Sequence, residues 1–337
     1  MQSWLCRLAS LKFTLVGMLL LGAGAAVSYG NPVDVSVWVL IVPLALLALN
    51  LSAAIVTNPG INSQPGLLLF HVCLLSTVVL AGVGRLTHLD AHLEIAEGQA
   101  FSPALLLEVQ KGPWHMGDLD KVAFTQGHYT VDYEPQLKRG LTHSTVYLPA
   151  PDGSLTPRDV GDDRPLVLER YRFYTTHNKG FSPILTWIPD QGQAVTGRIN
   201  MPSYPLFDYK QDNRWTPPGT QQEIQFWLQL DSGLDVEKSW VLDGRNSSAV
   251  LVVTVGDRRE ELQKGQEVSL PHGRLRYENL TTWMGYRVFY DPTIQWLFFV
   301  TVAGVLGLAH YFWQKLNLQA WMDEAETSSV DNHGASA

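Results

Sequence analysis

His71 is the one ionisable side chain in the 19-residue apolar run 66–84 (GLLLFHVCLLSTVVLAGVG). As a helix this run is about 28 Å long, which matches a hydrocarbon core of roughly 30 Å. His71 would then lie about 7 to 8 Å inside one face of the bilayer. An imidazole at that depth needs a hydrogen-bond partner or a ligand, because an unpaired polar group in hydrocarbon costs several kcal/mol. Two interpretations stay open: a hydrogen bond between packed helices, or a functional ligand site.

Asn50 is a second polar group at a similar depth. It lies in the apolar segment 35–57, which is followed by the turn 57–66 (TNPGINSQPG). Counted inward from this turn, Asn50 is about 10 Å deep, and the next helix runs antiparallel. We therefore expect a hydrogen bond from Asn50 to His71, either as simple packing or as an outer contact that orients a metal-binding imidazole.

Few other motifs in the chain carry chemistry. There is no GxSxG nucleophile motif and no P-loop. The histidines of the region after residue 87 have no metal-binding spacing such as HExxH; they are His88, His92, His115, His128, His143, His177 and His272. We therefore predict that the chain is not an enzyme in its own right and holds no metal of its own in this region.

Cysteine content and charge exclude further classes. Cys6 and Cys73 are the only cysteines, and both lie in or beside apolar segments, so the rest of the chain has neither a disulfide nor a cysteine-type zinc site. The formal net charge of -8, without a basic stripe, argues against a nucleic-acid partner, because such binding rests on Lys and Arg at phosphates.

The charged residues are distributed very unevenly. The first 85 residues contain only four charged side chains, namely Arg7, Lys12, Asp34 and Arg85. This part of the chain predicts an N-terminal membrane domain over 1–87, and residues 291–316 predict one more membrane helix, followed by an acidic tail over 317–337. The three N-terminal helices are expected at about 13–29, 35–57 and 66–85.

Residues 88–290 show a different pattern. Short β-type segments are separated by Gly, Pro and Asp: ALLLEV, STVYL, PLVLERYRFY, PILTWI, EIQFWLQL, AVLVVTV, GRLRYENL and GYRVFY. Eight such runs without a helical period predict an all-β domain, either a sandwich or a partly open barrel. The fold class is therefore an integral membrane protein with three N-terminal transmembrane helices, a large β domain and one C-terminal transmembrane helix.

The first apolar run has an alternative interpretation. Its small-residue end, GAGAA at 22–26, resembles the cleavage site of a signal peptide. We favour a retained helix, because two further apolar segments follow at once and Gly17 and Gly24 form a small-residue face suited to close helix packing.

Positive charges near the helix ends predict the orientation. Arg7, Lys12 and Lys315 lie on one side, whereas the short loop 30–34 on the other side has no Lys or Arg. We expect both termini and the turn 57–66 in the cytoplasm, and the β domain outside it. Membrane lipid is thus an expected partner.

Several stretches in combination resemble the ResB-like (CcsB) family of system II cytochrome c biogenesis proteins. They are ASLKFTLVGMLLL (9–21), LALLALNLSAA (44–54), PGLLLFHVCLLSTVVLAGVGRLT (65–87), HLEIAEGQAF (92–101), RFYTTHNKG (172–180) and VFYDPTIQWLFFVTVAGVLGL (288–308). The resemblance touches most of the predicted layout, although it covers the β domain only in patches.

The resemblance implies a function in a bacterial inner (plasma) membrane. Such a chain works with a CcsA-type cytochrome c synthase subunit, carries haem across the membrane and helps join it to the CXXCH motifs of apocytochrome c. His71 would be an axial ligand of the haem iron near the cytoplasmic side, with haem bound transiently and shared with the partner. Asn50 would fix the imidazole tautomer, and His88 and His92, four residues apart, would share a face that touches haem if the third helix continued outward.

The chain also departs from this family. It has no tryptophan-rich haem-handling motif, so the CcsA-type subunit would be a separate chain. DPT replaces the expected DPG at 291–293, and the turn 57–66 lacks its usual basic residues. A membrane-anchored β-domain scaffold or assembly factor that binds no haem is the alternative. For the haem-binding interpretation, we expect the second axial ligand from the partner rather than from His310, which opens the aromatic run 311–313 typical of a membrane interface.

Overall fold

The computed structural model describes residues 2–30, 34–150, 152–231 and 235–334. The chain divides into two compact units. The helical unit contains Met1–Leu89, Gln110–Met116 and Asp291–Ala337, and the β unit contains Asp90–Val109 and Gly117–Tyr290. The helices and most of the strands thus fall in separate units, and the short segment Gln110–Met116 belongs with the helices.

The helical unit contains four helices that are long and apolar enough to cross a membrane. They are α2 (Leu11–Gly30), α3 (Trp38–Thr57), α5 (Pro65–Thr87) and the first part, Ile294–Asn317, of α6 (Ile294–Gly334). The short helices α1 (Gln2–Leu8) and α4 (Pro59–Asn62) precede α2 and α5. The three N-terminal helices and the C-terminal helix expected from the sequence are confirmed as helices. The backbone of α6 is helical through most of the expected tail, of which residues 335–337 lie outside the described residues.

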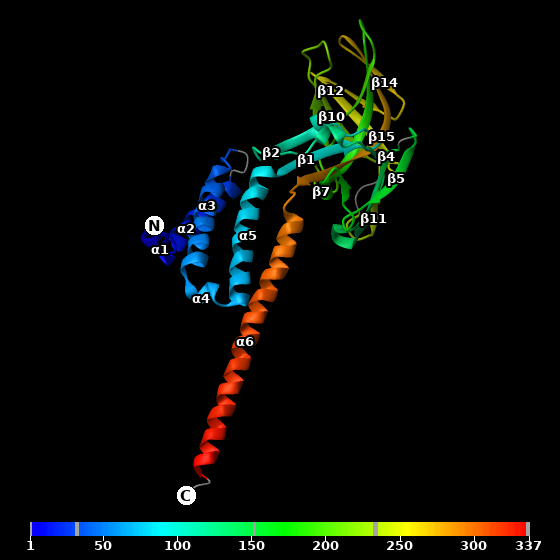
Figure 1. Ribbon diagram of the computed structural model, residues 1–337. Coiled ribbons are helices and arrows are strands. Elements are labelled where there is room, and N and C mark those ends of the chain that lie inside the picture. Colours follow the sequence, from blue (N-terminus) through cyan, green and yellow to red (C-terminus); the bar gives the residue numbers. More distant parts are fainter. Residues whose placement is uncertain (1, 31–33, 151, 232–234, 335–337) are drawn as a thin grey trace. The chain divides into compact units, whose positions relative to one another are not determined.

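Within this unit α2 packs on α3, α3 on α5, and α5 on α6 (Figure 1). The α5–α6 contact is close because it is lined by small residues. A Cβ atom added at Gly66 would lie 2.6 Å from the carbonyl oxygen of Gly307, and one added at Gly304 would lie 3.1 Å from Cβ of Cys73. Such small residues let helix backbones approach where lipid supplies no hydrophobic driving force.

Local sequence explains where these helices begin. The Asn58 side chain accepts a hydrogen bond from the amide of Gly60 at 2.9 Å, which caps α4, and Pro59 fits the first turn because its missing N–H is not needed there. Asp291, the first residue of the DPT motif, accepts hydrogen bonds from the amide and the hydroxyl of Thr293, at 2.8 and 2.7 Å, just before α6. Thr293 therefore supplies a donor that a glycine at this place would lack.

The β unit consists of three open sheets in the described part of the chain. A seven-stranded sheet has the order β2-β1-β15-β7-β6, with β14 pairing with β15 and β8 with β7; two four-stranded sheets have the orders β11-β3-β4-β5 and β13-β12-β10-β9. The strands are β1 (Leu89–Ala96), β2 (Leu106–Lys111), β3 (Thr125–Glu134), β4 (Lys138–Pro149), β5 (Leu155–Val160), β6 (Leu166–Leu168), β7 (Tyr171–Pro189), β8 (Val195–Arg198), β9 (Asp212–Trp215), β10 (Ile224–Leu230), β11 (Trp240–Leu242), β12 (Ala249–Val255), β13 (Arg258–Leu262), β14 (Glu267–Leu270) and β15 (Gly273–Tyr290). The β-rich character expected from the sequence is confirmed.

The longest strands, β7 and β15, pair antiparallel along most of their length (Figure 1). Their register shifts between Tyr277 and Asn279 and again between Met284 and Tyr286. Such shifts bend a strand without ending it. Large aromatic side chains fill the core around this pair: Tyr129, Tyr171, Phe173, Phe181, Trp187, Tyr277 and Tyr286 are fully buried.

Candidate functional site

His71 lies in the second turn of α5 with one ring nitrogen engaged. Its Nδ1 is 2.8 Å from the carbonyl oxygen of Leu67, one turn earlier. Because a carbonyl oxygen can only accept, Nδ1 carries the proton and Nε2 is the nitrogen with a free electron pair. The described residues offer no hydrogen bond to Nε2. The ring of Phe70 meets the imidazole edge-on at a centroid distance of 5.4 Å.

The position of His71 around α5 is set by the residues that face α6. Cβ atoms added at Gly307 and Gly304 would each lie 3.1 Å from Cβ of Leu69 and Cys73, respectively. His71 is two residues from each of these, which is about 200° around a helix of 3.6 residues per turn. The imidazole therefore projects from the face of α5 opposite α6.

Asn50 does not contact His71, which corrects our expectation. Its Oδ1 accepts a hydrogen bond from the hydroxyl of Thr14 at 2.7 Å. Its Nδ2 donates to the carbonyl oxygens of Leu8 and Ser10, the latter at 3.2 Å. Depth alone suggested the pair with His71. Asn50 instead faces the break between α1 and α2, where backbone carbonyls lack helical partners and need a donor.

His88 and His92 do not form a helical pair, which is a second correction. Helix α5 ends at Thr87, and β1 begins at Leu89. His88 is the C-terminal cap and is buried, with Nδ1 2.8 Å from the carbonyl oxygen of Arg85. His92 is exposed on β1, 3.1 Å from a carboxylate oxygen of Glu108. The i,i+4 relation requires a helix, and the chain changes to a strand at this point.

His310 approaches the other helix at the α5–α6 contact. A Cβ atom at Gly66 would lie 3.2 Å from Cδ2 of His310. Gly66 precedes His71 by five residues, which places the two positions about 140° apart around α5 and about 7.5 Å apart along it. His71 and the contact point of His310 are therefore on different faces of α5.

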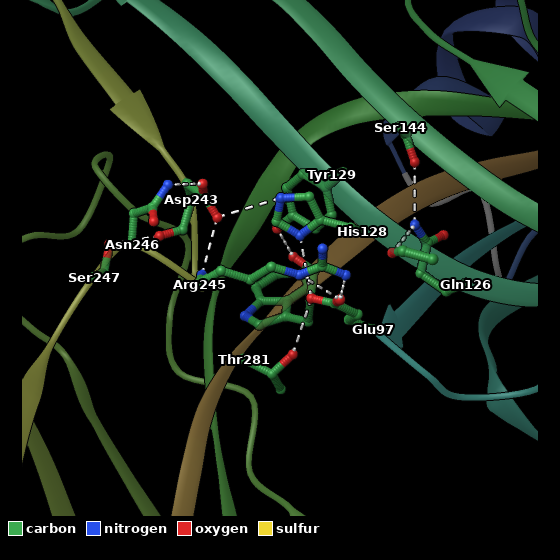
Figure 2. A network of polar contacts seen from close by, with 12 residues as sticks. Glu97, Gln126, His128, Tyr129, Ser144, Asp243, Arg245, Asn246, Ser247 and Thr281 are labelled. Atoms are coloured by element: carbon green, nitrogen blue, oxygen red, sulfur yellow. Dashed lines mark hydrogen bonds and ion pairs between the residues drawn. The ribbon is translucent and has the colours of Figure 1, made fainter. Parts of the chain in front are cut away.

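The β unit contains a polar cluster that the sequence spacing did not reveal. Figure 2 shows His128 of β3 between Glu97, which follows β1, and Asp243, which follows β11. Nδ1 is 3.4 Å from Glu97 Oε2, and Nε2 is 3.3 Å from Asp243 Oδ1. Arg245 donates to Glu97 Oε1 at 2.6 Å, and Asn246 donates to Asp243 Oδ2 at 2.6 Å. The cluster joins two sheets by charged hydrogen bonds.

Lys179 of β7 is an unusual residue in the same unit, because it is fully buried. Its Nζ is 3.2 Å from the hydroxyl of Thr142, and Arg139 and Asp162 lie in the same group of contacts. Burial, with a smaller effect of the nearby Arg139, lowers the pKa of Lys179 to about 7, and Asp162 opposes this shift. The pKa of Asp162 is also lowered. Burial alone would raise this pKa, but the combined effect of hydrogen bonds and positive charges around the carboxylate is larger.

The side chains that could act as ligands limit which metal groups the chain can bind. The described residues include no group of three or more His, Cys, Asp or Glu side chains that could hold a metal ion. A haem iron is different, because the porphyrin supplies four ligands and the protein needs to supply only axial ones. The Nε2 atom of His71 fits this requirement for one axial position, with Leu67 holding the ring.

Comparison with known proteins adds no relative. No protein-family model matches the chain, and no curated protein matches it.

Proposed function

We propose that the chain is a ResB-like subunit of a cytochrome c-type biogenesis complex, which helps carry haem across a bacterial inner membrane. The observation that carries this proposal is His71. Its imidazole lies in an apolar helix with Nδ1 hydrogen-bonded to Leu67 and Nε2 available, on the face of α5 opposite α6. An intramembrane imidazole with an available nitrogen is a costly feature unless it binds something.

In this proposal haem is the cargo, and His71 supplies one axial ligand to its iron. The chain's own contribution is to hold the ring in one tautomer and one orientation through Leu67. The second ligand comes from a helix of a CcsA-type partner. Haem would then be bound at the contact between two subunits and held weakly by either one alone.

The topology of the proposed complex follows from the charges. Arg7, Lys12 and Lys315 favour cytoplasmic N- and C-terminal segments, which puts His71 near the cytoplasmic face. The β unit then lies on the periplasmic side, where the apocytochrome would receive its haem. The cluster around His128 and the buried Lys179 are assigned no part in holding haem.

The direct test is to purify the chain together with its CcsA-type partner and measure the Soret absorbance per protein. We expect a Soret band in the complex and little haem in the isolated chain. A complex that assembles fully but has no Soret band after haem is supplied would favour the alternative, a membrane-anchored scaffold that binds no haem.

A further inference from the structure

Aromatic side chains mark one end of the helical unit. At the end where α2 finishes and α3 and α6 begin, Tyr29, Trp38 and Trp296 are 91%, 51% and 63% exposed. The ends of α2 and α3 lie together, since a Cβ atom at Gly24 would lie 2.8 Å from the carbonyl oxygen of Val39. Tyr and Trp at such positions are typical of the layer where lipid headgroups meet water.

Helix α5 ends at this level too, but it brings no aromatic residue. A Cβ atom at Gly84 would lie 3.0 Å from the hydroxyl of Thr293, just before α6. The last two turns of α5, residues 81–87 (AGVGRLT), contain no Tyr, Trp or Phe. Three of the four apolar helices thus carry an aromatic anchor at this end, and α5 does not.

The segment Gln110–Met116, which belongs to the helical unit, lies against the bare end of α5. The amide of Trp114 donates to the carbonyl oxygen of Leu86 at 2.8 Å, and the amide of Gly112 donates to that of His88 at 2.9 Å. The His115 Nδ1 is 2.8 Å from the carbonyl oxygen of Thr87. These bonds satisfy carbonyls that a helix end leaves without partners.

Close approach at Gly112 makes this docking possible. A Cβ atom at that position would clash with the carbonyl oxygen of Leu86. The docked segment presents Trp114 and Met116, which are 57% and 82% exposed, and the exposed Lys111 beside them. Leu86 is 21 residues beyond Pro65, or about 32 Å along α5, so Trp114 is at the edge of a hydrocarbon core of roughly 30 Å.

We propose that Gln110–Met116 is a membrane-interface anchor, in which Trp114 and Met116 contact the lipid headgroup layer and supply the aromatic anchor that α5 lacks. Lipid is the occupant that the structure favours, because the segment is hydrogen-bonded at the membrane end of an apolar helix, level with the other three aromatic anchors. Lys111 suits anionic headgroups. This inference does not depend on haem binding.

The test uses the full chain with Cys6→Ser and Cys73→Ala, in vesicles of phosphatidylcholine and phosphatidylglycerol. A single cysteine is placed at Trp114 or Met116 and labelled with an environment-sensitive fluorophore. Two positions that are each 62% exposed serve as matched controls: Val305 in the apolar part of α6, and Leu141 in the β unit. Quenching is measured at each position with a nitroxide on the lipid headgroup and, separately, with a nitroxide near the end of the acyl chain.

We expect strong quenching by the headgroup nitroxide at 114 and 116, strong quenching by the acyl-chain nitroxide at 305, and almost none by either at 141. Adding Gly112→Val to the Met116→Cys chain should reduce quenching at 116 toward the level of 141. Quenching at 114 and 116 as weak as at 141 would overturn the proposal. So would blue-shifted emission without lipid quenching, which would mean that protein covers the segment. A label at 305 that the acyl-chain nitroxide leaves unquenched would show that α6 is not in the membrane, and this would also overturn the proposal.

Discussion

The Nδ1 atom of His71 lies 2.8 Å from the carbonyl oxygen of Leu67, so the ring is held by its own helix and not by a neighbouring one. A histidine whose only role was to join two helices would form its hydrogen bond with the other helix. Here the bond stays within α5 and engages Nδ1, and no described residue forms a hydrogen bond with Nε2. An available Nε2 is what an axial ligand of a haem iron requires.

His310→Ala should leave the haem content and spectrum of the assembled complex nearly unchanged. The ring of His310 reaches α5 at Gly66, on a different face from His71. Absorbance spectra of the wild-type and variant complexes, at equal protein, check this. If His310→Ala removes a bis-histidine spectrum as completely as a change at His71 does, both axial ligands belong to this chain and the shared-site proposal is wrong.

Asn50→Leu should destabilise the helical unit without changing haem per protein. The variant loses the hydrogen bonds to Thr14, Leu8 and Ser10, and we expect the free energy of unfolding to fall by about 1–3 kcal/mol. Thermal unfolding in detergent measures the loss. Ser76→Ala is the matched control, because the Ser76 hydroxyl bonds only to Val72 in its own helix. A fall in haem per protein equal to that of a His71 variant would instead place Asn50 at the ligand.

Gly66→Leu should weaken the α5–α6 contact, whereas Gly82→Leu in the same helix should have little effect. A side chain at Gly66 meets the backbone of Gly307 at 2.6 Å, but one at Gly82 meets no atom within 4 Å. Overpacking of this kind costs typically about 1–3 kcal/mol. The yield of folded protein and its melting temperature in detergent compare the two variants. Equal effects would mean that α5 and α6 do not pack as described.

The free energy of unfolding should rise as the pH increases from about 7 to about 10, because of Lys179. An unfolded lysine keeps its proton up to about pH 10.4, whereas the folded one loses it near pH 7, so the unfolded state binds more protons across this window. At about 1.4 kcal/mol per pKa unit the upper bound is about 4–5 kcal/mol. Below pH 7 both states are protonated, and the cost of burying the charge is fully present.

Lys179→Met should remove most of this pH dependence and stabilise the protein near pH 7. Thermal unfolding followed by the β-sheet circular dichroism signal, at several pH values, provides the measurement. Lys138→Met is the control, because Lys138 is exposed and pairs with Glu134 at the surface. A pH profile that Lys179→Met leaves unaltered would show that Lys179 is charged in the folded protein.

The length of the apolar runs made the helices predictable from the sequence, but the contacts between side chains were not predictable. Apolar runs of 17 or more residues identified α2, α3, α5 and α6, because length and hydropathy suffice for such helices. The β-type segments were also recognised. However, 183–188 and the end of 165–174, residues 171–174, belong to the single strand β7, whereas 166–168 form β6. Likewise, 273–280 and 285–290 are parts of β15, because register shifts let one strand bend where the sequence looks like two.

The site was predictable only in part. The depth of His71 followed from counting residues, but the partner of Asn50 did not, because depth says nothing about which way a side chain points around its helix. The change from helix to strand at His88 was not predictable, because residues 85–91 contain no Gly or Pro. The contact between Trp114 and Leu86 joins residues 28 positions apart in sequence, and only the folded chain brings them together.

The most direct test of the central claim is the haem-to-protein ratio of the complex carrying His71→Gly, measured with and without added imidazole. Glycine leaves a space at the ring position, and free imidazole can occupy the vacated axial position of the iron. We predict a ratio well below that of the wild-type complex, and partial recovery when imidazole is added. An unchanged ratio with a reduced amount of protein would contradict the account and make His71 a packing residue.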